Sequence, residues 1–157
     1  MKAKVYVETS VLSYIAARPS RDVIIAGRQA VTHEWWEKHR HRFTLLVSAV
    51  VADEAGRGDP TQSARRLELL AGITRVAIST EAADLAAQLL ESGGVPPGSE
   101  EDALHIAIAA TQGADFLVTW NFKHINNAEL KTLISSIVEA FGYQCPLFCS
   151  PENLRGD

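Results

Sequence analysis

Short apolar runs alternate along the chain with longer stretches in which apolar residues recur every three or four positions. The short runs are typical of buried strands and the longer stretches of amphipathic helices. This pattern predicts strands at residues 3–7, 43–47, 74–78 and 115–119, with a short edge strand at 146–149. Between them it predicts helices at residues 11–17, 22–39, 48–54, 60–72, 80–90, 99–110 and 128–141.

Polar residues at the predicted helix starts support these boundaries, because their side chains can accept hydrogen bonds from free backbone N–H groups. The candidate N-caps are Asp22, Ser48, Thr80 and Ser99. The helix after Asp22 is the longest, and its apolar residues at helical spacing are Ile24, Ile25, Ala30, Val31 and Trp35. Residues 93–98 (GGVPPG) form a loop, because glycine and proline interrupt both helices and strands.

Strands that alternate with helices indicate an α/β fold with a mostly parallel central sheet of four to five strands and helices on both faces. The chain has 157 residues, which fits a single domain over residues 1–157. Functional groups in such folds gather beyond the carboxyl ends of the strands. That rule directs attention to Glu8, after the first strand, and to Trp120 and Asn121, after the fourth.

Residues 1–14 contain a short apolar run that polar residues interrupt, which does not resemble a signal peptide. The longest apolar runs are far shorter than the roughly 20 residues that cross a bilayer, so we expect a cytoplasmic protein without membrane association. Cys145 and Cys149 are interpreted as reduced thiols in a terminal strand, because no second Cys or His pair follows at zinc spacing.

The formal net charge is −4, whereas nucleic-acid binders are usually basic. This charge still allows a nuclease whose acids surround a metal ion. The densest basic run, residues 38–42 after Trp35 and Trp36, could follow an RNA backbone or could be a solvated helix C-terminus. Arg18, Lys123 and His124 lie nearer the predicted strand ends and are better placed to meet a phosphate.

Acids and amides occur at four places that this architecture could bring together. They are Glu8, Asp53 with Glu54, residues 100–102 with Asp102 last, and Asn121. Several carboxylates in one cleft repel one another unless a cation neutralises them. Oxygen ligands without a Cys or His set suit Mg²⁺ or Mn²⁺, which can bind a phosphodiester oxygen and activate water. The pattern predicts a divalent-metal site.

Each of these positions has a purely structural alternative. Glu8 could be a solvated strand end, and Glu54 a surface residue. Asp102 stands three residues after Ser99, where an acid resembles a capping box, and Asn121 could be a turn residue. His105, three residues beyond Asp102, could carry a proton or simply pack between helices.

The chain resembles the PIN-domain ribonucleases of the VapC toxin kind over essentially its whole length. The matching segments are residues 5–10 (VYVETS), 47–54 (VSAVVADE) with 58–59 (GD), 101–109 (EDALHIAIA) and 117–124 (LVTWNFKH). Each segment alone is weakly specific, whereas four in this order and spacing are fairly specific.

The resemblance implies a three-layer α/β/α sandwich and a Mg²⁺- or Mn²⁺-dependent endoribonuclease. It also implies an RNA substrate, a small antitoxin protein as partner and a homodimer. The acidic positions of the family map onto Glu8, Glu54, Asp102 and Asn121, of which the first three would bind the metal. Thr119, Ser10 and Glu101 would support them, and Lys123, His124 and Arg18 would contact the substrate.

Two positions depart from the family pattern. Glu8 and Asn121 stand where the family often has Asp. Glu8 is a longer carboxylate, whereas Asn121 is neutral and lowers the expected negative charge, which disfavours two-metal occupancy. A weakened PIN-like module that binds RNA or a protein without cutting is therefore an alternative. A phosphoacceptor domain ranks last, because it would use an Asp at a strand end and a Lys at a later one, where this chain offers Glu8 and Lys123.

Overall fold

The computed structural model describes residues 1–156. The strands are β1 (Lys4–Val7), β2 (Thr44–Ser48), β3 (Thr74–Val76), β4 (Phe116–Val118) and β5 (Leu147–Cys149). The α-helices are α1 (Thr9–Ala16), α2 (Val23–Glu34), α3 (Ala49–Ala55), α4 (Pro60–Leu70), α5 (Thr80–Glu91), α6 (Glu100–Thr111) and α7 (Ala128–Ala140). Three short helical segments are η1 (Trp35–His39), η2 (Arg40–Arg42) and η3 (Pro151–Leu154).

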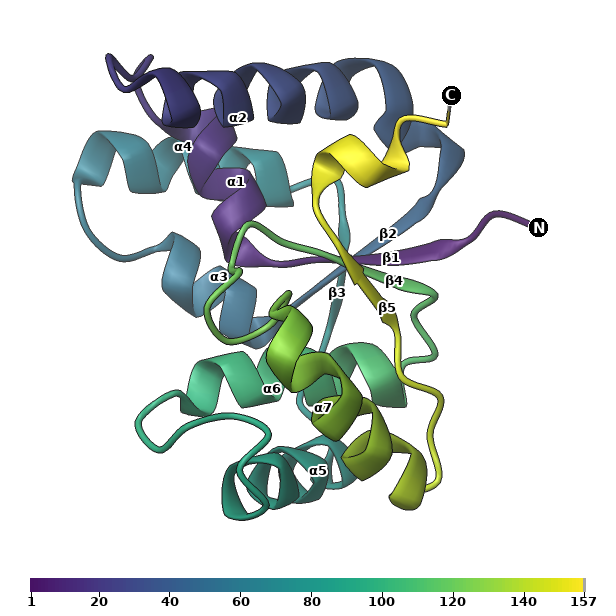
Figure 1. Cartoon of the computed structure of the whole chain (residues 1–157). Helices are drawn as coiled ribbons and strands as arrows, with labels where there is room; N and C mark the ends of the chain where they lie inside the picture. Colours follow the sequence, from purple (N-terminus) through teal and green to yellow (C-terminus); the bar gives the residue numbers. More distant parts are fainter. Residues whose placement is uncertain (157) are drawn as a thin grey trace.

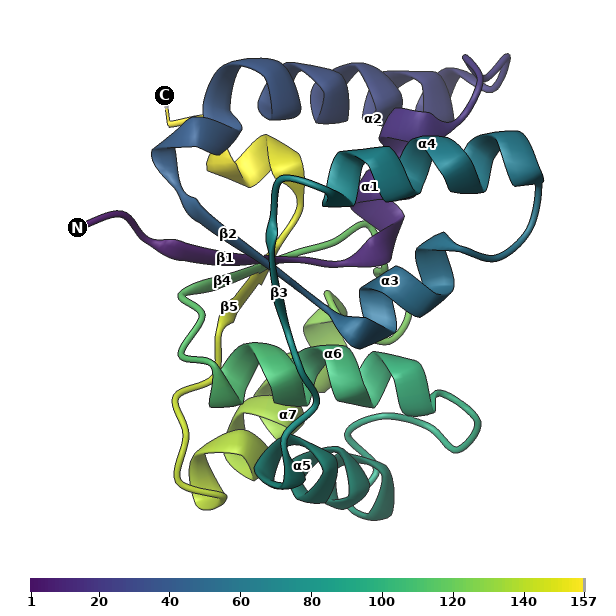
Figure 2. The same ribbon diagram turned by 180° about the vertical axis from the view of Figure 1, so that it is seen from behind.

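All five strands are parallel and lie in the order β3-β2-β1-β4-β5. Helices α1, α2 and α4 cover one face of the sheet, and α5, α6 and α7 cover the other (Figure 1; Figure 2 shows the reverse side). The predicted α/β class and three-layer sandwich are confirmed. No helix within residues 1–156 combines the length and the apolar character needed to cross a bilayer.

The inner residues of the central strands are apolar on both sides of the strand because helices cover both faces of the sheet. Val5, Tyr6 and Val7 of β1 are fully buried, and Tyr6 pairs with Leu46 of β2 and Leu117 of β4. Burial on both faces therefore explains why the sequence reads as continuous apolar runs rather than as an alternating pattern.

The predicted helix at residues 22–39 is not one uniform α-helix. It is an α-helix to Glu34 and a π-helical turn over Trp35–His39, followed by the 3-10 segment η2. Ile24 and Ile25, two of the apolar residues at helical spacing, are 66% and 38% exposed. The buried residues of α2 are the polar Gln29 and Thr32. The Gln29 side chain forms hydrogen bonds with the backbone of Arg18 and Ser20, and Thr32 Oγ1 accepts one from Trp120 Nε1.

Two predicted caps differ in detail. Ser79, not Thr80, caps α5, and its Oγ accepts a hydrogen bond from the Ala82 N–H at 3.1 Å. Ser99 precedes α6 as predicted but forms no side-chain cap, and its Oγ lies 3.3 Å from His124 Nδ1. Asp22 and Ser48 cap α2 and α3 as predicted.

The sheet topology determines where functional groups can meet. Strand β1 lies at the centre of the sheet, with β2 and then β3 on one side of it and β4 and then β5 on the other. The boundary between β1 and β4 is therefore the topological switch point, where α/β folds place their ligands. Glu8 follows β1 directly and Thr119 follows β4 directly, so both lie at this point.

Candidate functional site

Glu8 leaves β1 with a buried, firmly oriented carboxylate. Its backbone N–H donates to the Val118 carbonyl at 3.1 Å, which extends the pairing of β1 with β4 by one residue. Glu8 is 5% exposed, and its Oε1 accepts hydrogen bonds from Ser10 Oγ at 2.5 Å and Thr119 Oγ1 at 2.6 Å. Both donors use one oxygen, so Oε2 receives no hydrogen bond from any described residue and can serve a ligand.

Glu54 reaches the same region from the last turn of α3. Its Oε1 accepts hydrogen bonds from Thr9 Oγ1 at 2.5 Å and from His105 Nε2 at 2.6 Å. As at Glu8, the donors share one oxygen, and within the described chain no hydrogen bond reaches the other. Consecutive residues after β1 thus hold the two acids, because Thr9 contacts Glu54 while Ser10 contacts Glu8.

A buried chain of polar side chains stands behind Glu54. His105 is completely buried, and its Nδ1 lies 2.8 Å from Tyr6 Oη, which lies 2.7 Å from Ser48 Oγ. Burial raises the pKa of the Tyr6 hydroxyl, so this group stays neutral. Both ring nitrogens of His105 therefore have hydrogen-bond partners, which explains how α6 tolerates an imidazole among buried apolar residues.

Electrostatics favour an ion pair between Glu54 and His105. Burial opposes the charged form of both groups, but their mutual hydrogen bond and opposite charges outweigh it. The pKa of Glu54 is consequently lowered, with further contributions from Thr9 and Arg57. The pKa of His105 is raised, with further contributions from the charges of Glu8 and Asp102.

Asp102 lies in the first turn of α6 and has partners on both carboxylate oxygens. Oδ1 accepts from Asn121 Nδ2 at 3.2 Å, and Oδ2 lies 2.8 Å from His124 Nδ1. The backbone N–H groups of Lys123 and His124 donate to Asn121 Oδ1, which turns the amide nitrogen toward Asp102. Asn121 therefore acts here as a hydrogen-bond donor, a role that Asp at this position could not take when ionised.

Ligand atoms of Glu8, Glu54 and His105 all lie within 4.8 Å of one another. Among them, His105 Nε2 is engaged by Glu54, and Mg²⁺ and Mn²⁺ prefer oxygen, so we interpret His105 as a positioning residue. Asp102 lies outside this group, one helical turn before His105 on α6. Two partly hydrogen-bonded carboxylates with a third nearby are a donor set that fits a hard divalent cation.

The remaining predicted residues lie at different distances from this centre. Thr119 is buried and contacts Glu8, whereas Glu101 turns outward and forms an ion pair with Arg57, with Nη2 2.9 Å from Oε2. Arg18 is exposed and lines a hollow of about 530 Å³ together with Ser10. Lys123 is exposed. The structure thus gathers the acids in two adjoining clusters, one around Glu8 and Glu54 and one around Asp102.

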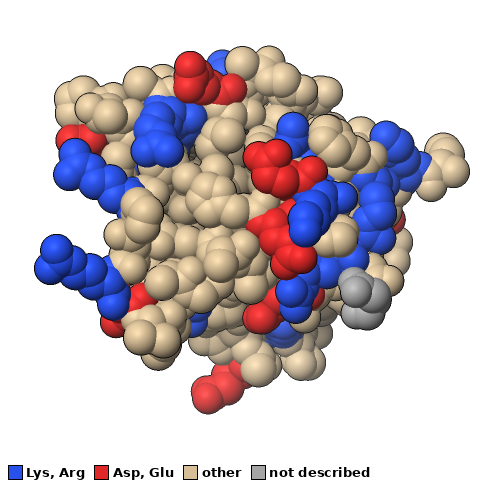
Figure 3. All heavy atoms as spheres, turned by 90° about the horizontal axis from the view of Figure 1, so that it is seen from above, with Lys and Arg blue, Asp and Glu red and all other residues tan. Residues whose placement is uncertain are grey.

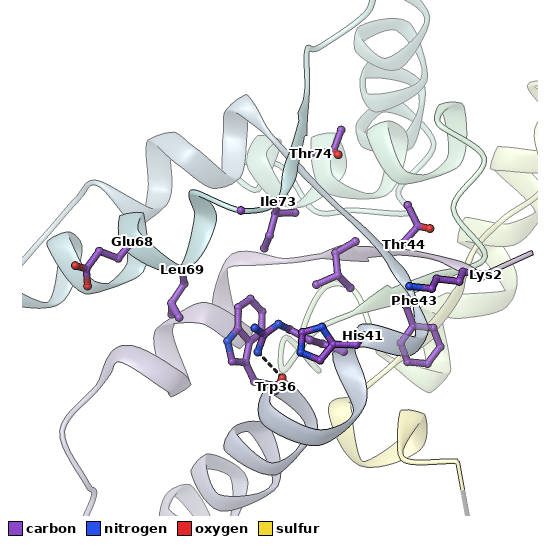
Figure 4. A pocket seen from close by; sticks show the side chains of 12 residues that line it. Lys2, Trp36, His41, Phe43, Thr44, Glu68, Leu69, Ile73 and Thr74 are labelled. Atoms are coloured by element: carbon purple, nitrogen blue, oxygen red, sulfur yellow. Dashed lines mark hydrogen bonds between the residues drawn. The ribbon is translucent and has the colours of Figure 1, made fainter.

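The basic run at residues 38–42 lies away from these acids. It leads into the amino end of β2, whereas Glu8 follows the carboxyl end of β1 and Glu54 lies in α3, which follows the carboxyl end of β2. Figure 3 shows Lys and Arg side chains at both ends of the face formed by α2, with Asp and Glu side chains among the denser group. A cavity of about 530 Å³ lies beside the basic run, and Figure 4 shows Trp36, His41 and Phe43 in its lining. The guanidinium carbon of Arg40 lies 4.5 Å from the Trp36 ring centroid.

The sequence analysis did not identify Thr9 and Tyr6 as residues that support the acids. It named His105 but not its role in positioning Glu54. A histidine in the otherwise apolar segment 103–110 was the one available signal, because a buried imidazole needs polar partners. Its partners come from β1 and α3, far away in the chain, so spacing alone could not identify them.

The fold and these clusters define a parallel α/β protein with a candidate cation site at the switch point of its sheet. The family model described as PIN domain matches residues 5–129, which is most of the chain. The chain belongs to the PIN domain family, as the sequence motifs predicted.

Two solved structures share the fold. Mycobacterium tuberculosis VapC20, a Sarcin-Ricin loop cleaving toxin, matches with a TM-score of 0.59 and 14% identity over 88% of this chain and 95% of that chain. Rickettsia felis VapBC2, bound to a DNA fragment from its promoter, matches with a TM-score of 0.56 and 21% identity over 79% of this chain and 94% of that chain. No curated protein matches the chain.

Proposed function

We propose that this protein is a metal-dependent endoribonuclease that hydrolyses RNA phosphodiester bonds, as the toxin of a toxin–antitoxin pair. The observation that carries the proposal is the meeting of Glu8 and Glu54, each with one oxygen held by hydrogen bonds and the other available. Membership of the PIN family and the shared fold with a toxin that cleaves the Sarcin-Ricin loop support it.

In this proposal Glu8, Glu54 and Asp102 hold Mg²⁺ or Mn²⁺. When bound, the ion would polarise the phosphodiester and lower the pKa of a water molecule. Ser10 and Thr119 orient Glu8, and Thr9 and His105 orient Glu54. These donors fix the carboxylates before a ligand arrives, which reduces the cost of organising the site.

Asn121 and His124 orient Asp102 in the same way. Arg18 and Lys123 are exposed cations near this region and would contact RNA phosphates. Because Lys123 follows Asn121 by two residues, its contact would lie close to the phosphate that reacts. Glu101 supports the site only indirectly, by fixing Arg57 beside the end of α3.

The toxin role implies a small antitoxin protein and a homodimer as partners. An antitoxin segment that inserted a basic side chain between Glu8 and Glu54 would satisfy their free oxygens in place of a metal. The shared fold with VapBC2 supports this part of the proposal. Co-expression with the protein encoded next to this chain, followed by gel filtration, tests both partners.

The central test is cleavage of a structured RNA by the purified chain with Mn²⁺, before and after Asp102→Asn or Glu8→Gln. We expect each variant to lose at least about 100-fold in rate, because it removes a charged metal ligand. Asp84→Asn on α5 is the matched control, since Asp84 is exposed and takes no part in the clusters. Equal cleavage by wild type and Asp102→Asn would reject the assignment.

A second candidate is a PIN-like module that binds RNA or a protein partner without cleavage. The donor role of Asn121, at a position where the family often has an acid, favours it. Calorimetric titration separates the two candidates. Absence of Mg²⁺ and Mn²⁺ binding at millimolar concentration supports the binding module, whereas metal binding with cleavage supports the nuclease.

A further inference from the structure

An arginine and two aromatic rings form a compact surface beside the acidic clusters. The guanidinium carbon of Arg28 lies 5.4 Å from the Trp120 ring centroid and 5.2 Å from that of Phe122. The two rings meet edge to face, with centroids 6.0 Å apart and an interplanar angle of 87°. We call Arg28, Trp120 and Phe122 the stacking surface.

The base of this surface is firmly held. Trp120 is 7% exposed, its Nε1 donates to Thr32 Oγ1 at 2.8 Å, and its ring meets Tyr14 edge to face at 5.6 Å. Phe122, by contrast, is 38% exposed. The exposed Phe122 ring, beside this firmly held base, provides flat apolar area for a ligand.

The stacking surface lies directly beside the proposed metal ligands. Ser10 Oγ donates to Glu8 Oε1 and also accepts from the Trp120 N–H at 2.8 Å. Asn121, which contacts Asp102, stands between Trp120 and Phe122 in the chain. One RNA strand that placed a phosphate at the acids could therefore lay an adjacent nucleotide on Phe122 and Arg28.

A hollow of about 320 Å³ adjoins these rings, and Ile24, Gly27 and Glu152 also line it. Its size lies at the lower end of small-ligand sites, which suits one planar group rather than a whole chain. The Glu152 carboxylate disfavours a phosphate at this point but can accept a hydrogen bond from an exocyclic amine. The combination of flat, cationic and acceptor groups matches a nucleobase.

We propose that Arg28, Trp120 and Phe122 form a stacking site for one unpaired base of RNA, next to the phosphate that is cleaved. This inference rests on the proposed ribonuclease function. Proteins bind unpaired bases by stacking them on aromatic rings and on the plane of arginine, and the arginine charge also favours the nearby phosphates. Glu152 adds a preference for bases that carry an amino group over uracil.

The test measures binding in EDTA, so that cleavage plays no part. Fluorescein-labelled oligocytidylate and oligouridylate are titrated with the full chain and followed by fluorescence anisotropy. Phe122→Leu removes the aromatic face but keeps apolar bulk, and Arg28→Lys keeps the charge but removes the plane. We expect roughly tenfold weaker binding of oligocytidylate by each variant, the effect of losing one stacked base.

Matched controls come from the same chain. Phe141, which directly follows α7, is also 38% exposed, and Arg75 is an exposed arginine on the edge strand β3. We expect Phe141→Leu and Arg75→Lys to bind both oligonucleotides as the wild type does. Glu152→Gln tests the base preference, and we expect the advantage of oligocytidylate over oligouridylate to shrink in this variant. Urea unfolding establishes that every variant is folded.

The outcomes separate this inference from the proposed function. A wild type that cleaves RNA, with Phe122→Leu and Arg28→Lys binding as tightly as the controls, overturns the stacking site alone. A wild type that binds oligocytidylate through Phe122 but cuts no RNA with Mn²⁺ overturns the nuclease proposal and supports base stacking. If both variants keep RNA affinity but lose a co-expressed protein partner, the surface binds a peptide and the inference is wrong.

Discussion

His105 Nε2 lies 2.6 Å from Glu54 Oε1, and the histidine is completely buried whereas the Glu54 side chain is 21% exposed. The pair thus links the interior of α6 to the carboxylate that faces the candidate site. Tyr6 and Ser48 complete the polar chain behind it, so that rotation of the imidazole would break two hydrogen bonds. Glu54 is therefore held in place by the core of the protein and not by its own helix alone.

Replacement of His105 should reduce stability. His105→Leu conserves apolar bulk but leaves the partly buried Glu54 without its charged partner, so we expect a loss of about 3 kcal/mol in the free energy of unfolding. Urea denaturation in EDTA measures it. His41 is an exposed histidine beyond α2, and His41→Leu should change stability by less than about 0.5 kcal/mol. Equal stability of both variants would show that the ion pair contributes nothing.

The contribution of this pair should depend on pH. The pKa of Glu54 is lowered from 4.5, so its contribution is complete above 4.5 and disappears as pH falls through the lowered value. The pKa of His105 is raised from 6.5, so its contribution is complete below 6.5 and disappears as pH rises through the raised value. The stability of the wild type should exceed that of His105→Leu by the largest margin between pH 4.5 and 6.5. Thermal unfolding in EDTA measures this difference. A stability difference between the two proteins that grows steadily above pH 6.5 would contradict the predicted direction of the pH dependence.

Asn121→Asp should exchange stability for metal affinity. The amide now donates to Asp102 at 3.2 Å, and an acid there would place two negative charges side by side. We expect a loss of about 1.4 kcal/mol without metal, the equivalent of one pKa unit, and roughly tenfold tighter Mn²⁺ binding by calorimetry. Asn126→Asp adds the same charge five residues later in the chain and should alter neither quantity. Unchanged Mn²⁺ affinity in Asn121→Asp would place the cation away from Asp102.

Mn²⁺ should stabilise the wild-type protein against heat. A ligand at 100 times its dissociation constant adds about 2.7 kcal/mol to the free energy of unfolding. Glu8→Gln should abolish the rise in Tm, because Glu8 is one of the two carboxylates with a free oxygen. Glu68→Gln on α4 serves as the charge-matched control and should keep the rise. If the rise in Tm persists in Glu8→Gln but disappears when EDTA is added, the metal binds to ligands other than Glu8.

The two buried tryptophans should respond differently to phenylalanine. Trp35 Nε1 is buried without a hydrogen-bond partner among the described residues, whereas Trp120 Nε1 donates to Thr32. Trp35→Phe removes a donor that is already unsatisfied, and Trp120→Phe breaks a hydrogen bond. We expect Trp120→Phe to be the less stable variant by about 1 kcal/mol in urea unfolding. The reverse order would mean that packing volume, not the N–H group, determines the difference.

Much of the architecture was predictable from local patterns. Runs such as residues 5–7 are apolar without alternation because helices cover both sheet faces, and this feature predicts a parallel sheet. Capping by Asp22 and Ser48 depends on near neighbours in the chain and was also predictable. The exposure of Ile24 and Ile25 was not predictable in this way, because helical spacing indicates an apolar stripe but not whether another element packs against it.

The amino-acid sequence by itself determined the α/β class, the PIN family and the identity of the candidate acids, because these depend on periodicity and on motifs in fixed order. Only the tertiary structure decided how the acids are held. Thr9, His105 and Glu54 come from different elements, and their hydrogen bonds exist only once β1, α3 and α6 pack together. The same packing turns Asn121 into a donor to Asp102 and brings Arg28 onto Trp120 and Phe122. Contacts between elements that are far apart in the chain leave no trace in local spacing.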